Sequence, residues 1–185
     1  MKKIQFTYHI TDALTPLDGR NRHKLSELIP FFSELALNKN RVFIEIEYLK
    51  ALSTHKVIRV LTQKEIKYLD EISNSFDTKS YKKLREIEST TNHDLQAVVV
   101  YIQRHLEGTS LGDLVEMVHF GLTSDDINNL SYALMLKNSV REVFLSELHK
   151  VEQCLKDMSS AYTHIPMLGK THGQSAAPTT FGKEM

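Results

Sequence analysis

The sequence has little of what cross-links a chain or bends it into tight turns. Its 185 residues include one cysteine, four prolines, seven glycines and no tryptophan. The single cysteine, Cys154, excludes a disulfide within the chain and is typical of a reducing compartment. The scarcity of glycine and proline favours long helices over a turn-rich β protein. We therefore expect a mostly helical protein with a cytoplasmic location.

Net charge and long apolar runs are also missing. Lysine plus arginine and aspartate plus glutamate each number 23, so the formal net charge is +0. This balance gives no support for binding to nucleic acid or to a membrane surface, and specific residues must therefore meet any anionic ligand. No apolar run reaches the roughly 18 residues of a membrane span, and none follows Lys2 and Lys3 as in a signal peptide. We expect neither nucleic acid nor membrane among the partners.

The sequence also lacks the motifs of metal and cofactor sites. It has no His-Glu-x-x-His pattern and no cysteine spacing typical of zinc. It has no phosphate-binding loop, no dinucleotide-binding glycine pattern and no Gly-x-Ser-x-Gly nucleophile elbow. We therefore expect no catalytic metal, no phosphate-binding loop and no dinucleotide site.

What the sequence does contain is a series of helical patterns with apolar residues three and four positions apart. Proline can open a helix, and a Thr-x-x-Glu capping box marks a helix start. Helices are predicted over about 30–53, 62–75, 79–88 and 95–106. No β pattern is found. Pro178 is expected to open one further helix.

The longest predicted helix follows Thr123 and continues to about Tyr162. Thr123 offers a cap, and acidic residues follow where the helix dipole favours negative charge. A helix about three times the usual length belongs to a bundle or a coiled coil. Its apolar row comprises Leu136, Val140, Phe144, Leu148, Val151, Leu155, Met158 and Tyr162.

The expected fold class is therefore all-α. We predict an N-terminal helical domain over residues 1–122, followed over 123–185 by the first long helix of a helix bundle. The helix predicted from Pro178 reaches Met185 after roughly two turns, which is short for a helix with its own packing. We interpret the chain as a fragment with an incomplete, truncated bundle domain.

Four polar segments interrupt the predicted helices, at the ends and loops where functional residues concentrate. They are 18–20, 92–94, 123–126 and 171–174. Arg20 follows a turn and is either solvated or a bidentate contact for an anion such as phosphate. In the second segment, Asp94 caps a helix, or His93 lies in a pocket where a carboxylate sets its protonation. The residues alone leave both alternatives open.

The other two segments also allow a purely structural and a functional interpretation. Thr123 and Ser124 form a helix N-cap, and such an N-terminus also binds carboxylate or phosphate. His119, which is expected on a mostly apolar helix, is interpreted as a satisfied core histidine. His172 stands beside Gly173, which allows a ligand to approach the backbone closely. This last segment is the strongest candidate for chemistry.

Taken together, the segments resemble the adenylosuccinate lyases of the fumarase/aspartase superfamily. The resemblance rests on the stretches 90–94, 119–129 and 171–185, and 15–20 is similar to the N-terminal substrate loop of these enzymes. It covers essentially the whole chain, in order. Thr-His-Gly-Gln is shared with other superfamily members, whereas Thr-Thr-Asn-His-Asp and Gly-Lys-Glu-Met are narrower.

The resemblance implies a C–N lyase of purine biosynthesis that needs no metal or organic cofactor. Adenylosuccinate is cleaved to AMP and fumarate, and the succinylated imidazole carboxamide ribotide is cleaved in the same way. The enzyme is a homotetramer in which three subunits contribute to each active site. Its catalytic base is a serine on a mobile loop with a Met-Pro and a lysine, which does not occur here. The fragment alone is therefore expected to be inactive.

The resemblance also implies roles for individual residues. His172 is the general acid, and His93 assists the chemistry. The remaining predicted residues contact the substrate. Arg20 binds its phosphate, and Thr123 and Ser124 bind an anionic group. The walls of the pocket are formed by Asn92, Asp94, Thr171 and Gln174. Asn21 stands where many relatives have tyrosine, which puts a contact from that position in doubt. Two alternatives stay open: a non-catalytic helical interaction module on the same fold, and a lyase for another succinyl compound.

Overall fold

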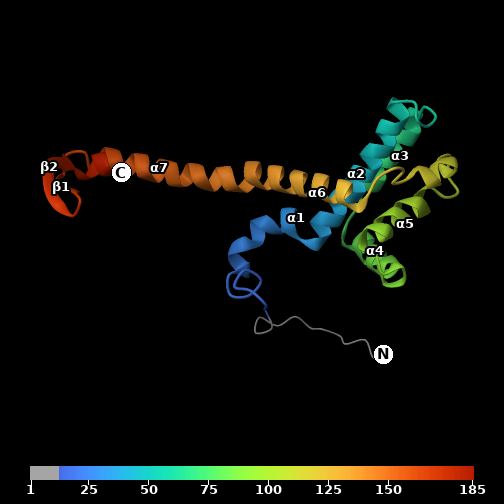
Figure 1. Cartoon of the computed structure of the whole chain (residues 1–185), viewed down its shortest axis with the longest axis horizontal. Coiled ribbons are helices and arrows are strands. Elements are labelled where there is room, and N and C mark those ends of the chain that lie inside the picture. The colour runs from blue at the N-terminus through green and yellow to red at the C-terminus, as the bar shows by residue number, and fades with distance from the viewer. Residues whose placement is uncertain (1–12) are drawn as a thin grey trace. The chain divides into compact units, whose positions relative to one another are not determined.

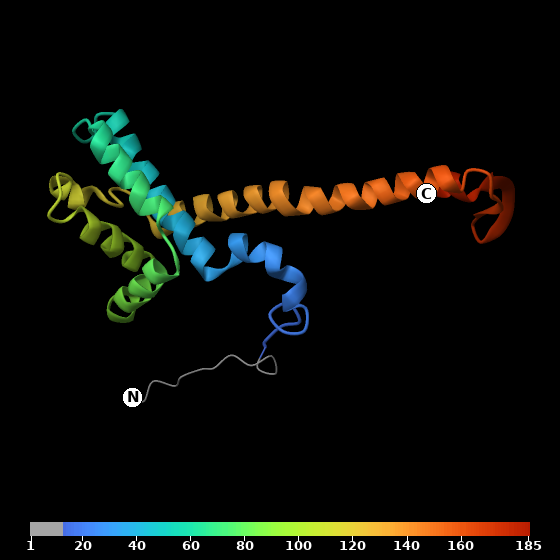
Figure 2. The same cartoon turned by 180° about the vertical axis from the view of Figure 1, so that it is seen from behind.

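The computed structural model describes residues 13–185, which form two compact units that meet between Asn138 and Ser139. Figures 1 and 2 show the elements from opposite sides. Apart from one two-stranded sheet, the regular structure of the described residues is helical, which confirms the all-α class. The first unit contains a 3₁₀ turn over Arg22–Leu28, α1 (Ile29–Phe32), α2 (Glu34–Thr54), α3 (Gln63–Asn74), α4 (Thr78–Thr91), α5 (Asp94–Leu106), a 3₁₀ turn over Gly112–Met117 and most of α6 (Ser124–Ser139). The second contains a π-helical turn over Val140–Phe144, α7 (Leu145–Ala161), β1 (Pro166–Thr171), β2 (Gln174–Thr180) and α8 (Phe181–Glu184).

Side-chain caps decide where several of these helices begin. The hydroxyl of Thr62 accepts from the amide of Glu65, whose carboxylate accepts from Thr62 in return, so the predicted capping box is confirmed. The single helix predicted over about 30–53 is wrong in one respect. Ser33 has an extended backbone and accepts from the amide of Ala36 at 3.2 Å. It therefore ends α1 and starts α2.

The core of the first unit is built around α2, with α3, α4 and α5 packed against it and α4 packed against α5. Leu69, Leu84, Leu95 and Leu106 are almost fully buried, and each contributes roughly 1.5–3 kcal/mol by leaving water. Helix α2 is unusual because it is buried on several faces and also buries polar side chains. Those polar residues are Asn38, Arg41, Glu45 and Ser53.

The long helical run predicted after Thr123 is confirmed, since residues 124–161 are helical without a break. The π-helical turn over Val140–Phe144 within it was not predicted. The compact units divide between Asn138 and Ser139, shortly before this turn. The domain boundary predicted at 122/123 stays a prediction.

The end of the chain differs from its prediction, because residues 166–180 form a β-hairpin. Strands β1 and β2 pair antiparallel, with Thr171 opposite Gln174 and Leu168 opposite Pro178. Pro178 therefore lies in a strand and does not open a helix, and the expectation of no β structure is wrong here. The following helix, α8, begins at Phe181 and is capped by Thr180.

Candidate functional site

The loop around Arg20 is organised by Asp18. One carboxylate oxygen of Asp18 accepts from the hydroxyl and the amide of Thr15, at 2.6 and 2.8 Å, and these bonds hold the pKa of Asp18 below its usual value. Arg20 is exposed just beyond, and Asn21 is half-buried. The bonds between Thr15 and Asp18 thus hold the loop without a contribution from the Arg20 guanidinium. This geometry is compatible with either interpretation of that side chain.

The second polar segment reverses the chain between α4 and α5 in two residues. Asn92 has a left-handed backbone, with φ 53°, and its amide donates to the carbonyl of Glu88 at 2.8 Å. Nδ1 of His93 then accepts from the amide of Gln96 at 3.2 Å and caps α5. Of the two alternatives for this segment, the one in which Asp94 caps the helix is therefore wrong. Since Nδ1 accepts a hydrogen bond, the proton of the neutral ring lies on Nε2.

Asp94 instead forms an ion pair with Arg41 of α2. Its Oδ2 accepts from the guanidinium at 2.7 Å. Partial burial raises the pKa of Asp94, but the hydrogen bond and charge of Arg41 outweigh it, so the pKa lies below its usual value. The carboxylate of Asp94 already has a cationic partner within the protein. Its predicted role in substrate binding stays a prediction.

The third segment forms the start of α6. The amide and hydroxyl of Thr123 donate to Oδ2 of Asp126, at 2.7 and 3.0 Å. The hydrogen bond from the Thr123 amide lowers the pKa of Asp126 most, and the hydrogen bond from the Thr123 hydroxyl lowers it further. Ser124, the first residue of α6, is half-buried. A negative charge at this helix start is thus supplied by the chain itself.

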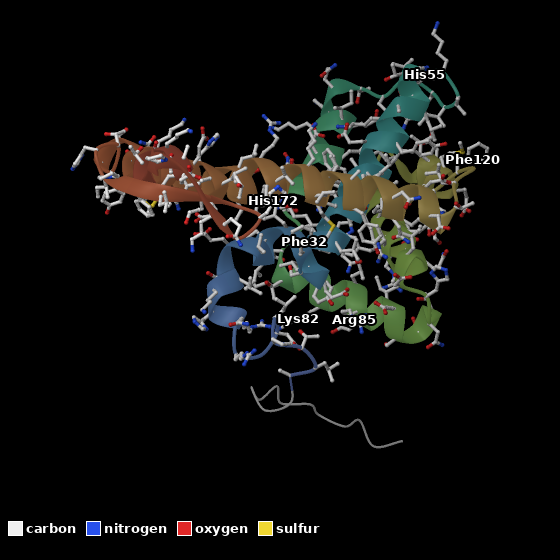
Figure 3. All side chains as sticks on the ribbon, turned by 60° about the vertical axis from the view of Figure 1, so that its left-hand side comes forward. Phe32, His55, Lys82, Arg85, Phe120 and His172 are labelled. Atoms are coloured by element: carbon white, nitrogen blue, oxygen red, sulfur yellow. The ribbon has the colours of Figure 1, made fainter. Side chains whose placement is uncertain are left out.

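The loop ahead of α6 is attached to α2 by two side chains that the sequence did not single out. Glu45 lies 2.5 Å from Nδ1 of His119, and the hydroxyl of Tyr48 donates to the carbonyl of Phe120 at 2.9 Å. Phe120 is labelled in Figure 3. The interpretation of His119 as a satisfied histidine agrees with its contact to Glu45, but the helix expected there is wrong, because His119 lies in a turn with a left-handed backbone, φ 64°. The available signal was a charged residue at position 45 between the apolar Ile44 and Ile46.

The fourth segment forms the tip of the hairpin. His172 and Gly173 both have positive φ, 52° and 76°, as in a two-residue turn of type I′. Thr171 and Gln174 are the last pair of the ladder, and all four residues are exposed. Figure 3 labels His172 on this hairpin. The imidazole is therefore presented by the backbone of a tight turn and is not buried in a core.

Within the first unit the structure brings two of the predicted segments together. Arg41 donates to Asp94 at the start of α5 and to Asn128 on α6, one turn beyond Ser124. Among residues 13–185, no hydrogen bond joins Arg20 to either segment. Thr171, His172 and Gln174 belong to the second unit.

Over residues 13–185, no group of three or more histidine, cysteine, aspartate or glutamate side chains is arranged to hold a metal. Among the helices of the same residues, none has the length and apolar character needed to cross a membrane.

Comparison with known proteins places the chain in a class. Residues 19–185 match the family described as lyase, and the chain belongs to that family. Two solved structures share the fold at 19% sequence identity. A fumarate lyase from Mesorhizobium sp. BNC1 has a TM-score of 0.66, and the match covers 85% of this chain and 35% of the fumarate lyase chain. A β-carboxy-cis,cis-muconate cycloisomerase from Acinetobacter calcoaceticus has a TM-score of 0.63, covering 85% and 36%.

The curated relatives are adenylosuccinate lyases, which confirms the predicted resemblance. The chain is 42% identical over 177 residues to the Escherichia coli K12 enzyme, covering 94% of this chain and 39% of that protein. It is 36% identical over 178 residues to the Legionella pneumophila (strain Philadelphia 1) enzyme, with the same coverage. The chain thus spans about two fifths of the length of these relatives.

Proposed function

We propose that this chain is part of an adenylosuccinate lyase, the part that carries the general acid His172. The observation that carries the proposal is the 42% identity to a curated adenylosuccinate lyase over 94% of the chain. The substrates are adenylosuccinate and the succinylated imidazole carboxamide ribotide. The products are fumarate and AMP or the imidazole carboxamide ribotide. This activity belongs to purine biosynthesis.

The reaction is an elimination in which one proton is removed and another is delivered. A base takes the proton from the carbon beside a succinyl carboxylate, and negative charge grows on that carboxylate. The C–N bond then breaks, its electron pair goes to the departing nitrogen, and the proton of His172 is transferred to that nitrogen. A histidine suits this task because its usual pKa is close to neutral. The base comes from a segment outside residues 1–185.

The geometry of the hairpin supports this role for His172. A turn with positive φ at two consecutive residues is narrow, and the exposed imidazole at its tip is available to a ligand. Gly173 adds no side chain beside it. Thr171 and Gln174 stand on either side of the turn and are proposed as pocket walls.

We propose corresponding roles in the first unit. Nε2 of His93 is its remaining donor and assists the chemistry. Asn92 and Asp94 form a wall of the pocket, Thr123 and Ser124 bind an anionic group, and Arg20 binds the phosphate. Asn21 is proposed as a neighbouring contact that lacks the stacking ability of tyrosine.

We also propose a homotetramer in the cytoplasm, with residues 123–185 as the start of a bundle domain. The described part of α7 has no buried residue, and it exposes an apolar row on the second unit. An apolar row at this spacing is suited to helix–helix packing. Its exposed members are Phe144, Leu148, Val151, Leu155 and Tyr162.

The test uses this chain joined to the remaining segment of the Escherichia coli relative. We expect the joined protein to cleave adenylosuccinate and the 185-residue chain alone to be inactive. His172→Asn should lower the elimination rate by roughly 10²–10⁴-fold, the usual contribution of a general acid. Asparagine is chosen because Asn-Gly is favoured in a type I′ turn, so the hairpin is retained.

Three results would contradict the proposal. Lyase turnover by the 185-residue chain alone would remove the need for a base from elsewhere. A folded, tetrameric joined protein that cleaves another succinyl compound but not adenylosuccinate would favour the second alternative. A folded joined protein with no lyase activity on any succinyl compound would favour the non-catalytic module.

A further inference from the structure

Helix α2 carries a buried row of polar side chains, Asn38, Arg41 and Glu45. Their exposed fractions are 3%, 3% and 1%. Their spacing of three and four residues places them on one face of the helix. Charged side chains are almost never buried to this extent unless they are paired. The partners of the row therefore show what the row holds in place.

Arg41 has partners on three helices. Its Nε donates to Oδ1 of Asn128 on α6 at 2.9 Å, and one terminal nitrogen donates to Oδ2 of Asp94 on α5 at 2.7 Å. The other terminal nitrogen lies 3.3 Å from Oδ1 of Asn38, one turn earlier on α2. All three contacts lie within the first compact unit. One planar guanidinium therefore sets the spacing between α5 and α6.

Asp94 belongs to one predicted substrate-binding segment, and Asn128 follows another. Asp94 is the first residue of α5 and follows His93, which caps that helix. Asn128 lies four residues beyond Ser124, on the same face of the first turns of α6. A displacement of either end of the guanidinium therefore displaces one segment relative to the other.

We infer that Arg41 is a positioning residue that fixes the segment 92–94 and the helix start at Thr123 and Ser124 in one mutual geometry. It acts through Asp94 and Asn128 and does not itself need to touch the substrate. The role in catalysis rests on the proposed lyase function. The geometric role does not depend on it.

Lysine is the sharpest replacement because it keeps the charge and loses the geometry. An ammonium group is a single point with rotatable donors, whereas the guanidinium donates in fixed directions from separate nitrogens. Arg41→Lys can satisfy Asp94 or Asn128 but not both in the native arrangement. At least one segment is therefore released while the net charge stays the same.

Arg59 offers a matched control within the same unit. Its guanidinium forks between Glu65 and Asp113, at distances from 2.7 to 3.1 Å, and it contacts neither predicted segment. The amide of Thr62 donates to the carboxylate of Glu65 at 2.8 Å and reports on that network. Arg59→Lys thus removes a comparable fork elsewhere.

The first experiment measures amide hydrogen exchange in the 185-residue chain. Arg41→Lys should raise exchange about tenfold at the amide of Gln96, at that of Thr123 or at both, since a lost hydrogen bond to a charged group has about that effect. Arg59→Lys should raise exchange at Thr62 and leave Gln96 and Thr123 unchanged. If Arg41→Lys does not fold, Asn128→Ala is used, and exchange should then rise at Thr123. Unchanged exchange at both Gln96 and Thr123 in Arg41→Lys, or at Thr123 in Asn128→Ala, would overturn the inference.

The second experiment measures kinetics in the joined lyase. Arg41→Lys should lower kcat/KM by roughly 10²-fold, the scale expected for a misplaced site. Arg59→Lys should leave kcat/KM close to normal at a temperature where both variants are folded. Equal losses in the two variants would make Arg41 a stabilising residue only. If the unsubstituted joined protein has no lyase activity, the proposed function fails, and the exchange data still decide the geometric role of Arg41.

Discussion

The carboxylate of Glu45, in the buried middle of α2, lies 2.5 Å from Nδ1 of His119 in the loop ahead of α6. His119 has a left-handed backbone, with φ 64°, and the contact fixes the loop in this conformation. Burial raises the pKa of Glu45, and the hydrogen bond and charge of His119 offset only part of this. The other carboxylate oxygen is buried with no hydrogen-bond partner in the described structure. Glu45 thus shapes the approach to Thr123 at a cost in stability when it is ionised.

Glu45→Gln should remove one component of the pH dependence of stability. Because the pKa of Glu45 is raised, the folded chain retains a proton that the unfolded chain loses above its ordinary value of 4.5. The free energy of unfolding should therefore fall as pH rises from 4.5 through the raised pKa, by about 1.4 kcal/mol per pH unit. Urea unfolding followed by circular dichroism at several pH values measures this slope. The same slope in wild type and Glu45→Gln would assign it to another group.

His93→Asn should separate the structural role of His93 from its chemical role. Asparagine is a good N-cap and can accept from the amide of Gln96 in place of the imidazole. We therefore expect thermal stability close to wild type, whereas His93→Ala should lose about 1 kcal/mol as other lost caps do. Both variants should lower the lyase activity of the joined protein. Normal activity of the asparagine variant would leave His93 only its capping role.

Glu65→Gln should lower stability near neutral pH and have less effect in acid. Hydrogen bonds from Arg59 and then from the Thr62 amide lower the pKa of Glu65 from its ordinary 4.5 to about 2. The wild-type contribution is therefore complete above pH 4.5 and is lost as pH falls to about 2. The difference in unfolding free energy between wild type and Glu65→Gln should shrink over this window. A difference that stays constant across it would show that the ion pair contributes no pH dependence.

Local signals explain which features could be predicted from the sequence. The capping box at Thr62 and Glu65 was predictable because both partners lie within four residues. Pro178 was misassigned for the opposite reason. Proline suits the first turn of a helix, but here it lies in a strand opposite Leu168, ten residues earlier. Pairing at that separation leaves no local pattern around the proline itself.

The candidate site was predictable as segments and not as a network. The polar segments stood out because they interrupt helical patterns. Arg41 did not, since a charged residue within an amphipathic helix ordinarily faces solvent. Its burial follows from Asp94 and Asn128, which lie 53 and 87 residues away in the sequence. Only the folded chain shows that these positions share one guanidinium.

The last prediction concerns Gly182, which lies where α8 meets the end of α7. A Cβ added there would lie 2.2 Å from the carbonyl oxygen of Ser159 and 2.6 Å from the amide nitrogen of Thr163. Both are backbone atoms and cannot rotate away, so Gly182→Ala should push α8 off α7. The 5.4 Å ring contact between Tyr162 and Phe181 should then be lost.

Nuclear Overhauser effects between the two rings and exchange of the Phe181 amide, which donates to Ile165, report this loss. The hairpin ladder is expected to persist, because its bonds lie between β1 and β2. Ser159→Ala is the control, since it removes the hydroxyl bond to the Gly182 carbonyl at 2.7 Å without adding volume. Ser159→Ala should lower the free energy of unfolding by only about 1 kcal/mol, the usual contribution of one hydrogen bond. If Gly182→Ala left the ring contact and the Phe181 amide unchanged, close packing against α7 would not be what anchors the end of the His172 hairpin.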